Sequence, residues 1–157
     1  MDRITVTPDR CTGCRACEMA CSFHHTDSFS PERSRIRVTK DEFRGIDVPT
    51  LCRQCVRPPC VEWCPADALR QSPTGIVEVD ADRCYGCGIC VEVCPYHAVN
   101  MDRLRGLPLI CNTCGGNPAC VGRCATQALR FEHPERAQAR RRQLLSVMRA
   151  KGVDDDE

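Results

Sequence analysis

The sequence predicts a small α+β fold, with short strands and helical turns organised by cysteines rather than by a large apolar core. Three observations support this prediction. The chain has 157 residues, enough for one domain or two small fused halves, and 16 of these residues are cysteine. Only four Phe, two Tyr and one Trp are available to fill an interior. The cysteines also fall into four runs of four, so that no thiol is left over.

The four cysteine runs are related by internal repetition. ITVTPDRCTGCRACEMAC at 4–21 aligns with VEVDADRCYGCGICVEVC at 77–94, and in both the gaps between cysteines are two, two and three residues. The runs at 52–64 and 111–124 have a longer middle gap but keep the last gap of three. The segments after the fourth cysteine also match, as in CPADALR, CPYHAVN and CATQALR. This repetition predicts two similar halves in one chain.

The predicted elements around these runs are short. Each cysteine loop is rich in Gly, Pro and Cys, and the residues that lead to its fourth cysteine fit one or two helical turns, at 18–22, 61–64, 91–94 and 121–124. Short strands are predicted at 36–39 and, after the turn SPTG, at 75–79. The stretch 22–50 contains no cysteine, and we expect an inserted loop and strand there.

A helix is predicted at 134–151. Pro134 suits a first-turn position, Glu135 suits the N-terminal end of the helix dipole, and basic residues follow toward the C-terminal end. Its apolar side would consist of Ala137, Leu144, Leu145 and Met148. We therefore expect two parts, a cysteine-rich domain at 1–133 and a docking helix with an acidic tail at 134–157.

The chemistry of the cysteines is open between disulfide bonds and metal ligation. Disulfides need an oxidising compartment, and the N-terminus MDRITVTPDRC has no apolar signal segment, no cleavage site and no twin arginine. We therefore expect a cytoplasmic chain, in which dense C-x2-C spacing indicates metal. No apolar run approaches the roughly 18 residues of a membrane-spanning helix, so no direct membrane insertion is expected.

Iron–sulfur clusters explain the spacing better than zinc. Structural zinc usually takes its ligands from two well-separated C-x2-C pairs, whereas here three cysteines share one loop and can hold three corners of a cubane cluster. In the pattern C-x2-C-x2-C-x3-C the fourth cysteine binds a second cluster, and residues 84–95 match that pattern including Pro95. The sixteen thiols predict four [4Fe-4S] clusters, and zinc in all or some of the sites is the alternative.

With these motifs, the chain resembles the four-cluster ferredoxin-like electron-transfer subunits of molybdenum and tungsten oxidoreductases. The resemblance covers about residues 6–131 and includes all four cysteine runs in order. The stretch CSFHHTDSFSPERSRIRV at 21–38 is most similar to the small iron–sulfur subunits of tungsten-containing aldehyde oxidoreductase complexes. The resemblance implies two fused bacterial-ferredoxin-like dicluster halves, which the helix predicted at 134–151 follows, and electron transfer as the function.

The resemblance also implies which cysteines share a cluster, because in such subunits the first run pairs with the fourth and the second with the third. The half built from runs 11–21 and 111–124 would hold one cluster on Cys11, Cys14, Cys17 and Cys124, and another on Cys111, Cys114, Cys120 and Cys21. The half built from runs 52–64 and 84–94 would hold one cluster on Cys84, Cys87, Cys90 and Cys64, and another on Cys52, Cys55, Cys60 and Cys94. Proline follows Cys64 and Cys94 but neither Cys21 nor Cys124, which agrees with this pairing.

The function predicted from these features is a non-catalytic relay of single electrons. The chain has no Gly-rich phosphate loop and no dinucleotide-binding fingerprint, and its interleaved basic and acidic residues give no indication of nucleic-acid binding. The resemblance implies a large molybdopterin or tungstopterin catalytic subunit as partner, with tungstopterin aldehyde oxidoreductase favoured, and a flavin (FAD) subunit or a soluble ferredoxin as acceptor. Twenty arginines against two lysines, together with the C-terminal helix, also suggest homo-oligomeric chains of copies.

Two other functions stay open at this point: a free-standing polyferredoxin that carries electrons without a fixed partner, and a structural zinc or interaction module. In a fixed subunit the apolar side of the C-terminal helix should be buried against a partner, whereas in a free carrier it should fold back onto its own domain. His24 and His25 follow the first run, and we expect them to lie beside a cluster and tune it rather than bind iron. His97 and His133 are weaker candidates for such a role.

Overall fold

The computed structural model describes the backbone of residues 1–150 and the side chains of residues 1–147. Within these residues the strands form four separate antiparallel pairs. These pairs are β1 (Arg3–Val6) with β8 (Leu129–Glu132), β2 (Ile36–Asp41) with β3 (Ile46–Leu51), β4 (Leu69–Gln71) with β5 (Val77–Val79), and β6 (Asn100–Asp102) with β7 (Leu107–Leu109). Together with the helices, they give the mixed α+β architecture that the sequence predicts.

One helix lies in each cysteine run, and a longer one follows the last strand. The helices are α1 (Ala16–Thr26), α2 (Pro59–Glu62), α3 (Ile89–Glu92), α4 (Ala119–Gly122) and α5 (Pro134–Ala150), and 3-10 turns lie at Pro8–Arg10, Pro31–Arg33 and Thr113–Gly116. The predicted bounds of α2, α3 and α4 were too late, since each is a single turn that ends two residues before the fourth cysteine of its run. A single turn is too short for the 3.6-residue pattern to mark where it begins.

Three of the four runs leave their helix in the same way. The residue three positions after the fourth cysteine takes a left-handed backbone, with φ of 47° at Asp67, 47° at His97 and 55° at Gln127. In each case this residue donates its N–H to the carbonyl of that cysteine, at 3.1 to 3.2 Å. The result is a tight turn directly after the fourth cysteine, and proline or alanine follows the cysteine in these runs.

The first run differs because α1 continues through Cys21 for eleven residues in all, longer than the one or two turns predicted. Ser22 stands where two of the other runs have proline, and its side chain is fully buried. Its hydroxyl donates to the Met19 carbonyl at 3.0 Å and accepts the N–H of Ser30 at 3.2 Å. Ser22 therefore lets the helix continue and ties the following loop to it. The insertion then forms the hairpin β2–β3 rather than the single strand predicted.

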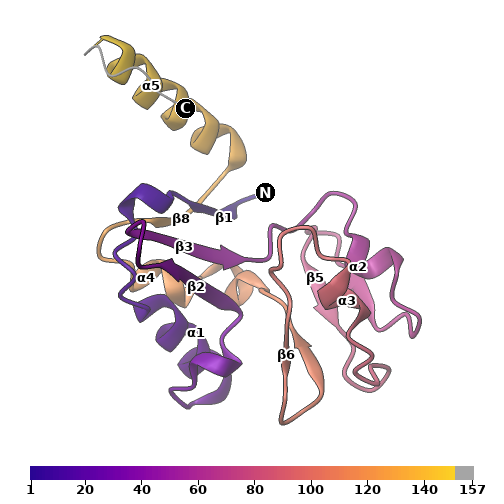
Figure 1. Ribbon diagram of the computed structural model, residues 1–157. Coiled ribbons are helices and arrows are strands. Elements are labelled where there is room, and N and C mark those ends of the chain that lie inside the picture. The colour runs from indigo at the N-terminus through magenta and orange to yellow at the C-terminus, as the bar shows by residue number, and fades with distance from the viewer. Residues whose placement is uncertain (151–157) are drawn as a thin grey trace.

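The buried residues form two cores that correspond to two halves of the molecule (Figure 1). In one half α1 packs against α4, and β1 pairs with β8 across most of the length of the chain. In the other half α2 packs against α3, and β4 pairs with β5. The first run thus lies beside the fourth, and the second beside the third. The division of the chain into domains at residue 133 stays a prediction.

The chain crosses between the two halves twice, and at each crossing two consecutive residues pack in different cores. Leu51 belongs to the first core, while Cys52 packs against both cores. On the return, Ile110 belongs to the second core and Cys111 to the first. The crossings therefore carry two predicted cluster ligands.

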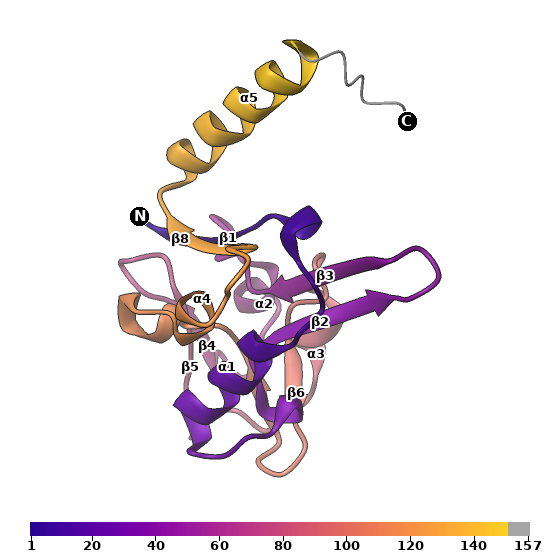
Figure 2. The ribbon, with the colours of Figure 1, turned by 90° about the vertical axis from the view of Figure 1, so that its left-hand side faces the viewer.

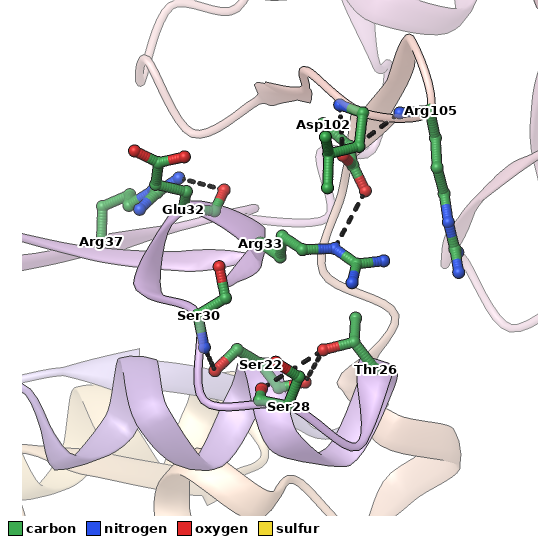
Figure 3. A network of polar contacts seen from close by, with 10 residues as sticks. Ser22, Thr26, Ser28, Ser30, Glu32, Arg33, Arg37, Asp102 and Arg105 are labelled. Carbon is green, nitrogen blue, oxygen red and sulfur yellow. Dashed lines mark hydrogen bonds and ion pairs between the residues drawn. The ribbon is translucent and has the colours of Figure 1, made fainter.

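An ion pair also joins the halves, between the turn that follows α1 and the β6–β7 hairpin (Figure 3). Arg33 Nε lies 3.3 Å from Asp102 Oδ2, and the two side chains are 18 % and 4 % exposed. Burial alone would raise the pKa of Asp102, but the backbone N–H groups of Leu104 and Arg105 and the Arg33 guanidinium outweigh it, and the pKa is lowered. Asp102 is therefore held as a carboxylate by partners inside the protein.

Helix α5 stands away from the rest of the molecule (Figure 2). Its first turns are tied to the β1–β8 pair, because Arg140 binds Glu132 at 2.7 Å and Glu132 accepts a hydrogen bond from Thr5 at 2.6 Å. Farther along, Leu144 is 53 % exposed. Of the predicted apolar side, the side chain of Met148 lies outside the described residues, as does the predicted acidic tail. Among the residues described, no helix combines the length and apolar character needed to cross a bilayer.

Candidate iron–sulfur sites

Three cavities are each lined by four of the predicted ligand cysteines. They are otherwise lined mainly by small or apolar residues. In each cavity three thiols come from one loop and the fourth comes from the run that packs against it. We name these groups set A (Cys11, Cys14, Cys17, Cys124), set C (Cys52, Cys55, Cys60, Cys94) and set D (Cys64, Cys84, Cys87, Cys90).

The remaining four cysteines form set B, which consists of Cys21, Cys111, Cys114 and Cys120. They lie around the packed helices α1 and α4. Burial raises the pKa of the Cys120 thiol, and the neighbouring Cys111, Cys21 and Cys114 raise it further. Electrostatic coupling of this kind requires the sulfur atoms to be close together. The structure thus gathers all four predicted sets, while iron ligation by each cysteine stays a prediction.

The buried thiols would have to lose their protons to bind a metal cluster. Burial raises the pKa of Cys17, Cys60 and Cys111 to about 12, and that of Cys52 and Cys90 to about 11. These thiols would therefore stay protonated at neutral pH unless a positive charge compensates the thiolate. Iron supplies that charge, and its binding releases the thiol protons. Four thiols around one small apolar cavity are also the ligand set that a [4Fe-4S] cluster requires.

Backbone N–H groups point at several of the fourth cysteines. The N–H of Ala68 lies 3.4 Å from Cys64 Sγ, and the N–H of Ala98 lies 3.4 Å from Cys94 Sγ. These two contacts occupy the same place in the two repeats, four residues after the cysteine. In the first run α1 continues past Cys21, and this thiol accepts the N–H of Arg35 at 3.3 Å instead. Such hydrogen bonds to sulfur help to set the reduction potential of an iron–sulfur centre.

Sets A and B lie in the first core and sets C and D in the second, and Cys52 of set C packs against both, from which we infer a line of sets in the order A, B, C, D. At each junction of this order, at least one cysteine lies close enough to a cysteine of the next set for their charges to influence a thiol pKa. The pairs are Cys17 with Cys120 between A and B, Cys52 with Cys111 between B and C, and Cys90 with Cys60 between C and D. Of the sixteen cysteines, two are exposed, Cys14 in set A and Cys87 in set D. The exposed thiols are therefore at the two ends of the line.

The histidines of the first run lie beside set B. Nε2 of His25 is 3.8 Å from Cys114 Sγ, and one ligand atom each from His24, His25 and Cys114 lies within 4.8 Å of the others. Burial lowers the pKa of His25 to about 4, with Arg35 and His24 adding to the effect, so the ring is neutral at pH 7. The contact agrees with the predicted tuning role, which itself stays a prediction. His97 lies in a turn, and His133 lies 3.6 Å from Glu135.

One buried polar residue between the cysteines of the second run was not predicted from the sequence. The third position of the first C-x2-C in each run has a left-handed backbone, with φ of 62° at Gly13, 76° at Gly86, 50° at Gln54 and 55° at Thr113. Glycine adopts this conformation freely, whereas other residues pay about 1–2 kcal/mol. Gln54 is 1 % exposed. The signal in the sequence is the alignment of CRQC with CTGC and CYGC.

Comparison with known protein families agrees with this geometry. A family described as a 4Fe-4S dicluster domain matches residues 43–134, and a second family of the same description matches residues 10–69. The two matches together include all four cysteine runs.

Several curated proteins are similar in sequence. The chain is 49 % identical over 88 residues to the aliphatic sulfonate oxidoreductase, polyferredoxin-like subunit, of Pyrococcus furiosus, covering 55 % of this chain and 50 % of that protein. It is 36 % identical over 92 residues to the electron transport protein HydN of Escherichia coli, covering 55 % and 52 %. It is 36 % identical over 87 residues to the thiosulfate reductase electron transfer subunit PhsB of Salmonella typhi, covering 52 % and 45 %. The chain thus spans about half the length of these relatives.

Among solved structures, the chain is similar to one in the active site complex BamBC of benzoyl coenzyme A reductase. The two are 28 % identical, with a TM-score of 0.52, over 94 % of this chain and 89 % of that one. The same complex with benzoyl-CoA gives the same TM-score over 93 % and 89 %. Since one dicluster family alone matches more than half of the residues and the thiols lie in four-membered sets, this chain belongs to the 4Fe-4S dicluster domain family of ferredoxin-like iron–sulfur proteins.

Proposed function

We propose that the chain is a non-catalytic electron-transfer subunit that relays single electrons through four [4Fe-4S] clusters, held by sets A to D. The observation that carries this proposal is the line of four thiol sets with an exposed cysteine at each end, Cys14 and Cys87. A line of this kind connects two partners on opposite sides of one small chain. The relatives support the same function, since they are named as electron-transfer or polyferredoxin-like proteins.

The residues of this chain would hold, shield and tune the centres. When bound, the clusters supply reversible one-electron chemistry. The inner thiols, such as Cys60, Cys111 and Cys120, are buried and keep water from sets B and C. The N–H groups of Ala68, Ala98 and Arg35 stabilise negative charge on sulfur at three separate sets. The contact from Arg35 gives set B an environment that differs from those of sets C and D, where the two contacts are equivalent.

The partner we propose is the large catalytic subunit of an oxidoreductase that contains a molybdopterin or tungstopterin. The resemblance of residues 21–38 favours a tungstopterin aldehyde oxidoreductase, which would oxidise an aldehyde to an acid. A flavin (FAD) subunit or a soluble ferredoxin would accept the electrons at the other end. The comparisons support a catalytic partner in general, because similar chains are named as subunits of oxidoreductases and occur in an active-site complex.

A fixed subunit explains α5 better than a free-standing polyferredoxin does. In a free carrier the apolar residues of this helix should fold back onto the chain's own domain. Leu144 and Val147 are exposed, and the helix stands away from both halves (Figures 1 and 2). We therefore propose α5 as a docking helix within a complex.

Affinity purification from native anaerobic extract tests the proposal. The expected result is co-purification of a larger subunit, with tungsten or molybdenum and iron measured in the complex, and flavin if that subunit is present. Recovery of the chain with iron alone would refute the fixed subunit and favour the free carrier. Mass photometry at several concentrations tests whether copies also join into chains, which a single small complex at all concentrations would refute.

A further inference from the structure

Gln54 occupies the junction between the two halves, and its side chain uses both ends of its amide. Nε2 donates a hydrogen bond to the carbonyl of Cys111, in the other half. Oε1 accepts the N–H of Val77 at 3.0 Å, in its own half. The side chain is 1 % exposed, so each of these contacts satisfies a polar group that water cannot reach. Gln54 therefore holds the second cysteine run against the fourth.

The backbone at Gln54 indicates that this side chain is needed. The equivalent positions in the first and third runs are Gly13 and Gly86, which adopt left-handed φ values without steric cost. Gln54 adopts the same conformation, with φ of 50°, at a cost of about 1–2 kcal/mol. The hydrogen bonds to Cys111 and Val77 offset this cost. The second run thus keeps a strained residue where its loop faces the other half.

The junction is also where the line of thiol sets passes from one half to the other. Cys52 belongs to set C and packs against both cores, and Cys111 belongs to set B. Gln54 lies two residues from Cys52 and contacts the carbonyl of Cys111 directly. Its amide thereby links a ligand loop of set C to a ligand of set B.

We propose that Gln54 is a positioning residue for electron transfer between the two halves, holding the Cys52 and Cys111 loops at the separation the transfer requires. The inference rests on the proposed electron relay. In the step concerned, one electron leaves a reduced [4Fe-4S] centre at set C, which is oxidised, and reduces the oxidised centre at set B, or passes in the reverse direction; no bond forms or breaks. Preorganised sites respond strongly to displacements of about 1 Å, so a loosened junction slows this step.

The test uses the purified holo chain under anaerobic conditions and the variant Gln54→Gly. Glycine relieves the backbone and matches the first and third runs, so this variant removes the amide without straining the loop. Gln54→Glu is the second variant: it keeps an acceptor for the Val77 N–H but loses the donor to Cys111. The control is Gln71→Leu, because Gln71 donates to the Cys55 and Gly75 carbonyls at 2.8 and 3.0 Å within one half only.

Two quantities are measured at equal iron content: the magnetic interaction between reduced centres by EPR, and the rate at which electrons equilibrate between the halves after a light pulse. Both Gln54 variants are expected to weaken the interaction and slow equilibration, while Gln71→Leu keeps wild-type values. Wild-type behaviour of either Gln54 variant, or equal slowing in Gln71→Leu, would overturn the role of Gln54. A wild-type chain with four centres but no equilibration would instead refute the proposed relay itself.

Discussion

Replacing Ser22 with proline is expected to break the first cysteine run, although two of the other runs carry proline at the equivalent place. Ser22 lies inside α1, four positions before the end of the helix. A proline there removes a helical hydrogen bond, and its ring collides with the carbonyl of Glu18. Pro65 and Pro95 avoid this conflict because α2 and α3 have already ended.

The expected cost follows from two contributions. Proline in a helix interior costs about 3 kcal/mol or more. The Ser22 hydroxyl is fully buried and accepts the Ser30 N–H, and leaving that donor without a partner costs about 1–3 kcal/mol. Together they give about 4 kcal/mol or more, which is a large part of the stability of a typical domain. Because Cys21 lies in the same helix, set B should lose its centre first.

Ala125→Pro is the matched control. Ala125 follows the fourth cysteine of its run as Pro65 and Pro95 do, and the turn after it has the same hydrogen bond, from Gln127 to the Cys124 carbonyl. Within residues 1–150 its N–H makes no backbone hydrogen bond. This proline is expected to be neutral or to stabilise by about 0.4–1 kcal/mol.

The assay compares iron per chain and the thermal midpoint by circular dichroism for the wild type and both variants, all prepared anaerobically. We expect loss of iron and a lower midpoint for Ser22→Pro only. Full iron content and a wild-type midpoint for Ser22→Pro would refute the reasoning, and so would equal damage by Ala125→Pro.

Three further predictions concern other contacts. Arg33→Ala leaves the buried Asp102 carboxylate without its charged partner and should cost about 2 kcal/mol. Arg44→Ala, at an exposed pair, should change stability by less than about 1 kcal/mol, and equal shifts in the thermal midpoint of the two variants would contradict this. Gly86→Ala should lower the iron content, because the added Cβ would lie 2.6 Å from the Gly106 carbonyl oxygen. Gly88→Ala should lower the iron content less, because no atom lies within 4 Å of the Cβ added there. Equal iron loss in the two variants would count against the reasoning. Removal of all iron should abolish cooperative thermal unfolding, since the clusters replace much of the core, and a cooperative transition of the iron-free chain by circular dichroism would contradict this.

The cysteine pattern predicted the coarse structure well because the spacing of ligands is a local property. The repeat of 4–21 at 77–94 predicts similar halves, and the α+β class is confirmed. The dicluster family matches confirm an iron–sulfur protein. The narrower link to a tungsten aldehyde oxidoreductase stays a prediction, because residues 21–38 resemble one subunit type without containing any group that binds tungsten or substrate.

Features that depend on contacts between distant segments could not be predicted. The length of α1 depends on Ser22 being buried and accepting the Ser30 N–H, which no sequence period reveals. The hairpin β2–β3 depends on pairing of Ile36 with Leu51 at its open end. Gln54 stands in the sequence as an ordinary polar loop residue, and its role emerges only when Cys111, 57 positions later, lies beside it.

The central claim is that sixteen cysteines hold four centres that accept electrons one at a time. Reductive titration of the purified anaerobic chain, with iron measured on the same sample, tests it most directly. We predict about 16 iron atoms and about four electrons accepted per chain, one electron for each [4Fe-4S] centre. A colourless protein that contains zinc, or a chain with about eight iron atoms that accepts about two electrons, would contradict it.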